Sequence, residues 1–265
     1  MPKTATIQKS VGQTPLECIE AFRQHTGIPS SVPLAYAGRL DPMASGTLLV
    51  LIGDECKKLA QYTHLDKQYR IEVLFGIGTD TGDVLGIAET SPRTTVTAHD
   101  VTACVRTFVG TRTYEYPKFS SKTVQGKPLH QWTNEGRIDE IRIPTKEATV
   151  YAIACVGVRT MSSDEVLHYV QNKIETIPPV TDESKKIGAD FRRVPIRARW
   201  DEIAHQHPHA VYTVATIVCT VSSGMYMRTL AGLMGEQLGT TALALSIHRT
   251  KIGHYYHLGP FGLLV

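Results

Sequence analysis

Hydrophobic and polar residues alternate along several stretches of the chain, which is the pattern of strands that bury one face. In DKQYRIEVLF, residues 66–75, every second side chain from the tyrosine onward is hydrophobic or aromatic: Tyr69, Ile71, Val73 and Phe75. Further strands are predicted at residues 5–10, 148–158 and 211–221. Residues 47–52 are too few for a typical helix and rich in Leu, Val and Ile, so they predict a buried strand or a short core segment.

Helical periodicity separates these strands. After the Thr14-Pro15 pair, hydrophobic residues recur at helical spacing at Leu16, Ile19 and Phe22, and Gly27 predicts the end of that helix. Residues 54–64 and 98–108 predict further helices. Near the C-terminal end a stripe of large apolar residues predicts one more helix, ended by Gly239: Leu230, Leu233, Met234 and Leu238.

One carboxylate stands in a restricted turn, in the stretch YAGRLDPMASG. Pro42 fixes its own φ and disfavours the helical conformation for Asp41 before it. Gly38 and Gly46 permit backbone conformations that other residues resist. Asp41 is therefore held in place, either as a solvated turn residue or as a functional carboxylate.

Two basic residues follow predicted strands. Lys9 ends the first strand, as either a solvated surface lysine or a contact to an anion. Arg228, in SSGMYMRTL, shares a face with Tyr226 if the preceding strand continues that far. An arginine at a strand-to-helix junction is well placed to meet a buried carboxylate.

Composition and charge describe an ordinary globular chain. Its 265 residues suffice for one large domain or two small ones, and a net charge of +3 allows an anionic partner without demanding one. Five scattered cysteines without a CxxC pair argue against a disulfide framework or a cysteine-rich zinc site, and for a reducing cytoplasm. The start has no apolar signal region, and no apolar run is long enough to span a bilayer.

Two further stretches invite a ligand interpretation. GIGTDTG has the wrong spacing for a dinucleotide fingerprint, and Asp80 and Asp83 would repel a pyrophosphate, so a turn is favoured. Residues 114–136 interleave lysines with Tyr116, Phe119 and Trp132. That pattern suits nucleic-acid contact, although a half-buried hairpin would look similar.

The pattern weakens between residues 160 and 210, which resemble an insertion. Its basic cluster is interpreted either as a solvated surface or as a contact to an RNA backbone, through Lys185, Lys186, Arg192, Arg193, Arg197 and Arg199. Histidines at 205, 207 and 209 alternate as on a metal-binding strand. Without a fitting acidic or cysteine partner, a polar turn is favoured, and no metal site is predicted.

Four blocks, in chain order, carry a resemblance: GRLDPMASG, DKQYR followed by GTDTGD, SSGMYMRTL, and SIHRTKIG. Each is a weak signal alone, but together they resemble the TruB-type family of tRNA pseudouridine-55 synthases over residues 5–160 and 210–255. The resemblance implies an α+β (mixed α/β) fold, with a mainly antiparallel central sheet flanked by helices, the pseudouridine synthase catalytic fold.

The resemblance implies that one uridine in the T-loop of tRNA is isomerised to pseudouridine without a cofactor. Asp41 matches the catalytic aspartate, Tyr69 the tyrosine that stacks on the target base, and Arg228 the arginine paired with the aspartate. Further positions match the uridine pocket or the lysine of the first motif: Tyr226, Ile247 and Lys9. We expect Arg228 to keep Asp41 ionised through a bidentate pair, because such a partner offsets the cost of burying the carboxylate.

The chain departs from the family pattern in three respects. Tyr36 stands where bacterial members usually have His, and we expect it to contact the substrate in its own way. Ser10 stands where a proline commonly follows the lysine. The sequence ends after the last core motif, so we expect no C-terminal PUA domain, and the basic insertion is a candidate substitute for it.

These observations predict one catalytic domain over residues 1–265, with the insertion at about 160–210. We expect a cytoplasmic monomer that binds the T-arm of tRNA and needs no membrane or metal. The alternative is a non-catalytic RNA-binding or tRNA-folding protein on the same scaffold, which an intact set of Asp41, Tyr69 and Arg228 argues against. A nucleotide-cofactor enzyme rests only on GIGTDTG and fails on its spacing.

Overall fold

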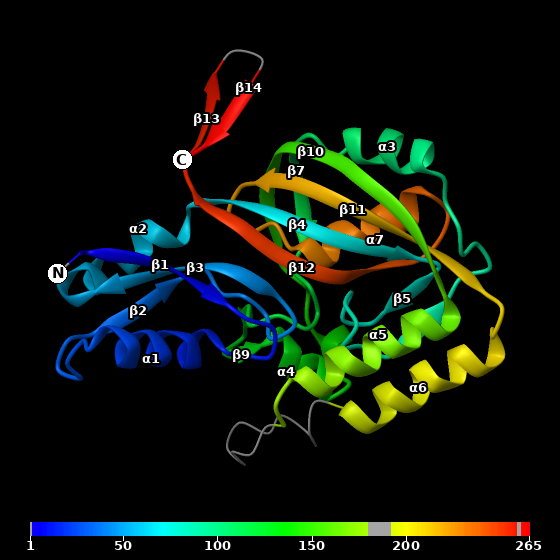
Figure 1. Cartoon of the computed structure of the whole chain (residues 1–265), viewed down its shortest axis with the longest axis horizontal. Coiled ribbons are helices and arrows are strands. Elements are labelled where there is room, and N and C mark those ends of the chain that lie inside the picture. The colour runs from blue at the N-terminus through cyan, green and yellow to red at the C-terminus, as the bar shows by residue number, and fades with distance from the viewer. Residues whose placement is uncertain (1, 180–191, 259–260) are drawn as a thin grey trace.

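A single twisted sheet organises the chain (Figure 1). The computed structural model describes residues 2–179, 192–258 and 261–265. Along the sheet the order is β1 (Thr4–Lys9), β3 (Ser45–Ile52), β12 (Ala242–Gly253), β4 (Asp66–Phe75), β11 (Val211–Val221), β10 (Thr145–Ser162) and β7 (Gly110–Glu115), with β2 (Leu34–Ala37) also paired to β3. All neighbours are antiparallel except β3 and β12. The predicted mixed fold with a mainly antiparallel sheet is confirmed.

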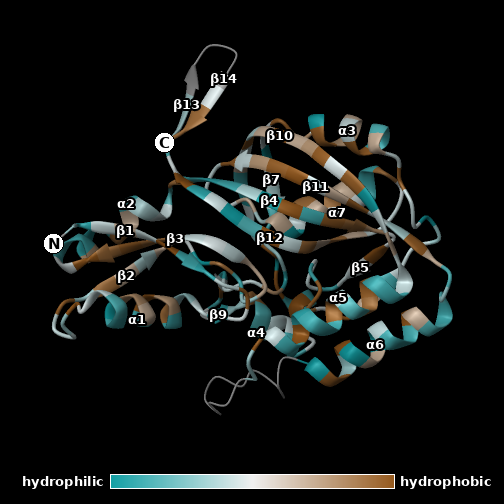
Figure 2. Cartoon of the chain, viewed as in Figure 1, coloured by the Kyte–Doolittle hydropathy of each residue, from teal (hydrophilic) through white to brown (hydrophobic). Residues whose placement is uncertain are grey.

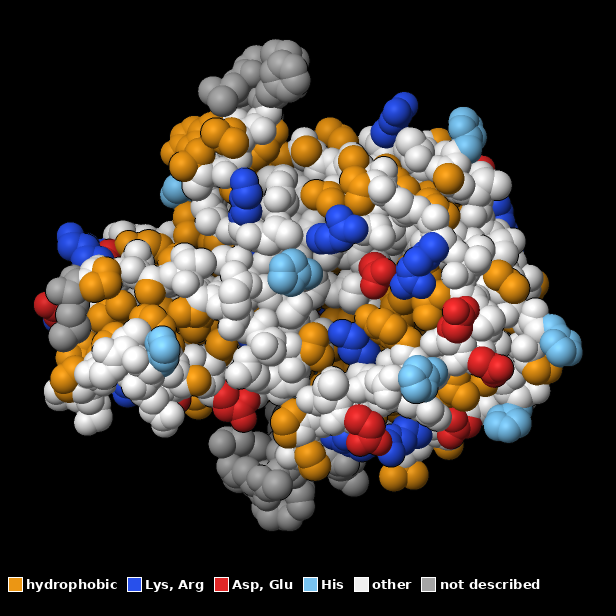
Figure 3. All heavy atoms as spheres, viewed as in Figure 1, with side chains coloured by type: hydrophobic (Ala, Val, Ile, Leu, Met, Phe, Trp, Pro, Cys, Tyr) orange, Lys and Arg blue, Asp and Glu red, His pale blue; other side chains and the backbone are white. Residues whose placement is uncertain are grey.

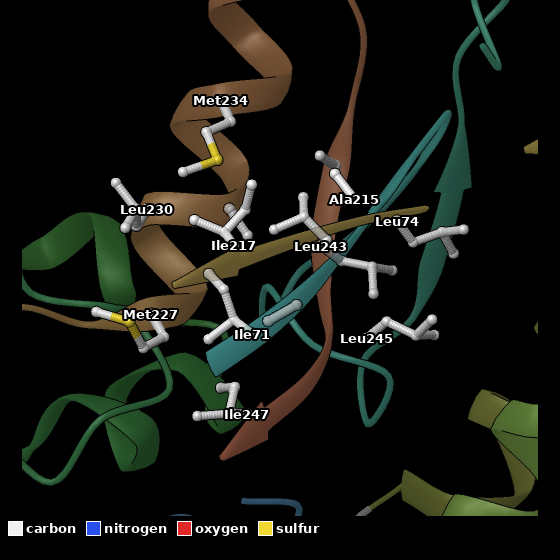
Figure 4. Packing of buried hydrophobic residues seen from close by; sticks show 14 of the residues in the cluster. Ile71, Leu74, Ala215, Ile217, Met227, Leu230, Met234, Leu243, Leu245 and Ile247 are labelled. Carbon is white, nitrogen blue, oxygen red and sulfur yellow. The ribbon is translucent and has the colours of Figure 1, made fainter. Parts of the chain in front are cut away.

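The alternation in β4 has the expected consequence, because its hydrophobic positions are buried. Helix α7 (Met227–Gln237) packs its apolar stripe against the middle of the sheet, and α3 (Ala98–Arg106) lies beside β10. Figure 4 shows Leu230 and Met234 of α7 over Ile71 of β4 and Ile217 of β11. Full burial of such side chains contributes about 1.5–3 kcal/mol each, so this cluster is the main core.

The N-terminal part forms a second, smaller core. Helix α1 (Pro15–Thr26) begins at Thr14, whose side chain accepts from the Glu17 amide in a capping box, and Gly27 at φ 67° ends it. It covers β2 and β3 through Ile19, as its apolar spacing predicts. The helix expected at 54–64 is instead a 3₁₀ turn (Gly53–Lys58) followed by α2 (Leu59–Thr63).

Short elements fill the connections. A hairpin is formed by β5 (Ile77–Thr79) and β6 (Ala88–Thr90). The GIGTDTG stretch contains β5, which was not predicted, and then the predicted turn. The remaining short elements are β8 (Thr123–Val124), β9 (Lys127–Pro128), α4 (Leu129–Asn134), a 3₁₀ turn (Ile138–Glu140), and the hairpin of β13 (Tyr255–Leu258) with β14 (Phe261–Leu264). No helix among the described residues is long and apolar enough to cross a bilayer.

The predicted insertion is a pair of helices between β10 and β11. Strand β10 runs on to Ser162, beyond the expected end of the strand, and α5 (Ser163–Thr176) and α6 (Arg193–Gln206) follow. Both helices are amphipathic (Figure 2) and bury apolar residues against the main core: Val166, Val170, Ile174, Ile196, Trp200 and Ile203. The two described helices of the predicted insertion therefore pack on the folded body rather than forming a solvated appendage.

Candidate active site

The Asp41 loop connects β2 to β3, next to the point where β3 pairs with β12. The Ala44 amide donates to the Asp41 carbonyl at 3.0 Å, and the Gly12 amide donates to the Pro42 carbonyl at 2.9 Å. The backbone is thus held on both sides of the carboxylate. The side chain of Asp41 is 46% exposed, so a ligand could reach it.

Two buried cations, Lys9 and Arg249, bind main-chain carbonyls of this loop. Lys9 of β1 is 1% exposed, and its Nζ donates to the carbonyls of Ala44 at 2.6 Å, Ser10 at 3.1 Å and Pro42 at 3.5 Å. The interpretation of Lys9 as a solvated surface residue is wrong. Its three donors face main-chain oxygens, so Lys9 holds the loop in place, and substrate contact by Lys9 remains a prediction.

Arg249 of β12 is the second cation, and it is also 1% exposed. Its Nε donates to the Thr47 carbonyl at 2.8 Å, while Nη2 and Nη1 donate to the carbonyls of Gly38 at 2.9 Å and Arg39 at 3.3 Å. Arg249 therefore holds the outer ends of the loop that Lys9 holds in the middle. The sequence analysis assigned no role to Arg249. Its position two residues after Ile247 puts it on the buried face of a strand, and a buried arginine needs partners within the protein.

Lys9 gives the first testable prediction, a pH-dependent contribution to stability. Burial is the main reason that its pKa falls from 10.5 to about 8. Between these values the unfolded chain binds more protons than the folded one, so stability rises with pH. Between about pH 8 and 10.5, the unfolding free energy of the wild type should therefore gain about 1–3 kcal/mol relative to Lys9→Met.

Urea unfolding of both proteins at the two ends of this pH range measures the difference. The comparison with Lys9→Met cancels the titration of groups that both proteins share. A constant difference between the two proteins across the range would show that Lys9 titrates as an ordinary solvated lysine.

Arg228 lies in the first turn of α7, not on a continuation of β11, so the expectation that it shares a strand face with Tyr226 is wrong. Its guanidinium is 6% exposed and faces the Asp41 loop. Nε lies 3.1 Å from Asp41 Oδ2 and 3.6 Å from Asp83 Oδ2. Nη1 donates to the Thr81 carbonyl at 2.9 Å, and Nη2 donates to the Phe119 carbonyl at 3.3 Å.

The expected bidentate pair between Asp41 and Arg228 is therefore not formed. The guanidinium instead divides its donors between two carboxylates and two carbonyls, and none of the described groups gives Nε a well-aligned hydrogen bond. Burial alone would lower the pKa of Arg228, but the charges of Asp41 and Asp83 raise it above its usual value. The guanidinium is fixed and charged, and it leaves one face of the Asp41 carboxylate open.

Asp83 is a member of the site that the sequence did not reveal. It is 4% exposed, and its Oδ1 accepts from the Thr81 hydroxyl at 2.8 Å and from the Leu85 amide at 2.9 Å. Burial raises its pKa, against the lowering effect of Arg228. In the sequence, Asp83 was considered only as a charge that would repel a pyrophosphate. Its cationic partner, Arg228, lies far along the chain, so the local pattern did not indicate it.

Aromatic side chains surround the carboxylate. Tyr69 of β4 is 8% exposed, and burial raises the pKa of its phenol, so the ring is present in its protonated form at neutral pH. Burial likewise raises the pKa of Tyr226, and the charge of Asp41 adds to the shift at both tyrosines. Tyr116 packs edge to face on Tyr226, with ring centres 5.9 Å apart. The site thus combines one reachable carboxylate with flat apolar surfaces.

Two other predicted substrate-binding residues, Ile247 and Tyr36, lie on strands of the main sheet. Ile247 is buried on β12 opposite Ile71 of β4 (Figure 4). Tyr69 lies two residues before Ile71 and therefore on the same face of the sheet. Tyr36 is half-buried in β2 and packs against the smaller core around Val50. Substrate contact by Ile247 or Tyr36 remains a prediction.

The basic cluster of the insertion is not a free patch. Each described arginine donates to a protein acceptor: Arg192 to Asp80, Arg193 to the carbonyls of Ile174 and Ile177, Arg197 to Glu175, and Arg199 to Glu202 and the Ala88 carbonyl. Acidic and basic side chains are interspersed on this side of the molecule (Figure 3). The predicted Lys185 and Lys186 lie outside the described residues. These contacts assign the arginines to holding the helices, and RNA contact by them remains a prediction.

Comparison with known proteins decides the family. Residues 31–177, more than half of the chain, match the model of the TruB family pseudouridylate synthase (N terminal domain). This chain belongs to the TruB family. Among its TruB-type relatives, tRNA pseudouridine synthase B of Caldicellulosiruptor saccharolyticus is 31% identical over 97% of this chain and 69% of its own length. tRNA pseudouridine synthase 4 of Saccharomyces cerevisiae is 30% identical over 57% of this chain and 40% of its own length.

Solved structures agree on the fold. The structure entitled "Crystal Structure of a Cbf5-Nop10-Gar1 Complex" contains a chain that aligns with 94% of this one at a TM-score of 0.55 and 14% sequence identity. This chain spans about half (48%) of the length of that chain. The likeness shows that the two chains share a fold over most of the described sheet.

Proposed function

We propose that this protein is a tRNA pseudouridine synthase that isomerises a T-loop uridine, position 55, with Asp41 as the catalytic carboxylate. The observation that carries the proposal is the pairing of a reachable Asp41 with a buried Arg228, 3.1 Å away, beside the ring of Tyr69. The names of the relatives, tRNA pseudouridine synthases B and 4, support the choice of tRNA.

The chemistry explains why the site needs these residue types. The N1–C1′ bond breaks, the uracil turns, a C5–C1′ bond forms, and the proton on C5 is replaced by one on N1. A carboxylate serves this sequence as a nucleophile at C1′ or as a base at C2′. Arg228 places a positive charge 3.1 Å from Asp41 Oδ2, and the loop contacts of Lys9 and Arg249 hold the carboxylate in place.

The target base has to leave its stack before its glycosidic bond can be reached. Tyr69 offers a ring to receive the base, and Tyr226 with Tyr116 forms a second aromatic wall. We expect contacts to RNA phosphates from the exposed Lys118 and from the exposed Lys122, whose Nζ lies 5.2 Å from the centre of the Tyr116 ring.

Incubation of the purified protein with an unmodified tRNA transcript, followed by chemical mapping of pseudouridine, tests this function. A single new pseudouridine in the T-loop is the expected product, and a transcript with cytidine at that position is the matched control. Tight tRNA binding without any pseudouridine would favour the non-catalytic RNA-binding alternative instead.

Substitutions at Tyr69 separate ring stacking from a role of the hydroxyl group. In a background of Asp41→Asn, which prevents turnover, Tyr69→Phe should keep the affinity for tRNA because the ring remains. Tyr69→Leu should weaken binding by about 1–3 kcal/mol, the usual worth of a base stacked on an aromatic ring. Filter binding or fluorescence anisotropy measures both, and equal losses in the two variants would remove stacking as the explanation.

A further inference from the structure

Arg192, the residue before α6, contacts two segments that border the candidate active site. Arg192 directly precedes α6 and has the left-handed φ of 59°, which non-glycine residues rarely adopt. Its Nη1 and Nη2 contact the two carboxylate oxygens of Asp80 at 2.5 and 3.2 Å. The guanidinium carbon also lies 4.6 Å from the centre of the Phe119 ring. Arg192 thus makes a bidentate pair and a cation–π contact at once.

Both partners of Arg192 belong to the segments that hold Arg228. Asp80 directly precedes Thr81, whose carbonyl accepts from Arg228 Nη1 at 2.9 Å. Phe119 itself supplies the carbonyl that accepts from Arg228 Nη2 at 3.3 Å. The two carbonyls that accept from Arg228 lie in separate loops, and the Arg192 side chain contacts both loops, at Asp80 and at Phe119.

A second contact fastens the other end of the first loop. Arg199 of α6 donates through Nε to the Ala88 carbonyl in β6 at 2.8 Å, and Asp80 Oδ1 accepts from the Ile87 amide at 2.9 Å. The loop from Asp80 to Ile87, which contains Asp83, is thus closed by the contact between Asp80 and Ile87. Arg192, just before α6, binds its first residue, and Arg199 of α6 binds Ala88, the residue after its last. A shift of α6 would move the groups that surround Arg228.

We propose that Arg192 is a positioning residue, which fixes from the start of α6 the two loops that orient Arg228 towards Asp41. This inference rests on the proposed function for its effect on rate. It differs from the interpretation of Arg192 as a phosphate contact, because its guanidinium is directed to Asp80 and Phe119 within the protein. Misplacement of a reacting group by about 1 Å can cost a hundredfold in rate, so a modest relaxation of these loops is measurable.

The test compares Arg192→Met with Arg159→Met. Arg159 of β10 is a matched control, because it is another partly exposed arginine in an ion pair, with Glu72 at 3.0 Å. At saturating tRNA, the single-turnover rate of Arg192→Met should fall about tenfold or more, while tRNA affinity and its salt dependence stay as in the wild type. Arg159→Met should keep the wild-type rate, and Arg192→Lys should recover part of the loss because it keeps the charge opposite Asp80.

Hydrogen exchange gives a readout that does not depend on activity. The Ala244 amide donates to the Gly82 carbonyl at 2.9 Å, in the middle of the fastened loop. Its exchange should be faster in Arg192→Met than in Arg159→Met. If the wild type makes no pseudouridine, the proposed function fails, and a changed exchange at Ala244 would still support the positioning role.

Two results would overturn the inference. One is an unchanged rate and unchanged Ala244 exchange in Arg192→Met. The other is a salt slope of log K that flattens by about 0.7–0.9 with the rate unaffected, which would make Arg192 a phosphate contact. A double variant with Asp80→Asn should lose no more rate than Arg192→Met alone, since both changes break the same pair.

Discussion

Asp41→Asn is expected to abolish pseudouridine formation, leaving less than a few per cent of the wild-type rate. The amide has nearly the same shape as the carboxylate but carries no charge, so it is a poor nucleophile and a poor base. Affinity for tRNA should stay within a few-fold, because the carboxylate acts on bonds rather than on the docking surface. Tritium release from C5-labelled uridine in tRNA measures the rate, and anisotropy measures the affinity.

Asp54→Asn is the matched control for this substitution. Asp54 is an exposed aspartate that pairs with Lys57 in the 3₁₀ turn after β3, and the same change there should leave the rate unaltered. Substantial turnover by Asp41→Asn would exclude Asp41 as the catalytic group and would move attention to Asp83, the other carboxylate beside Arg228.

Arg228→Lys should lower the single-turnover rate about a hundredfold or more, even though the positive charge is kept. The guanidinium reaches two carboxylates and two carbonyls from fixed directions, whereas an ammonium group places its donors at one point and cannot meet all four. Because Arg228 is 6% exposed, tRNA affinity should change little.

A Lys substitution at Arg159, whose ion pair with Glu72 is partly exposed, controls for the exchange itself and should have no effect on rate. Near-normal turnover by Arg228→Lys would mean that the charge alone suffices and that the shared arrangement around the guanidinium is unimportant. A large fall in thermal stability would instead identify Arg228 as a structural residue of the α7 start.

Local pattern predicted much of the fold because single-element rules act over a few residues. Strand β11 begins and ends at the predicted residues, 211 and 221, and α1 begins at a capping box and stops at a glycine. The pattern failed where tertiary contacts override it. The chain turns into α7 at Met227, and the strand β10 extends to Ser162, where its partner β11 continues the pairing.

The arrangement of charges could not be predicted in the same way. The surroundings of Lys9, Asp83, Arg192 and Arg249 come from segments far apart in the sequence, and a single sequence carries no information on which carbonyl or carboxylate will face which cation. Local pattern therefore suggested a solvated lysine for Lys9, a pyrophosphate-repelling turn for Asp83 and a basic patch for Arg192, and it suggested nothing for Arg249. The structure shows that all four are engaged within the protein.

By itself, the sequence determined the mixed, mainly antiparallel fold, the restrained turn that carries Asp41, and the motif order that the TruB family shares. These features depend on periodicity, turn chemistry and residue type, which are local properties. Only the tertiary structure decided that Arg228 Nε faces both Asp41 and Asp83, that buried Lys9 and Arg249 hold the Asp41 loop, and that α5 and α6 pack against the core. The physical reason is that buried charges are stable only where distant segments supply partners, and those partners exist only after the chain has folded.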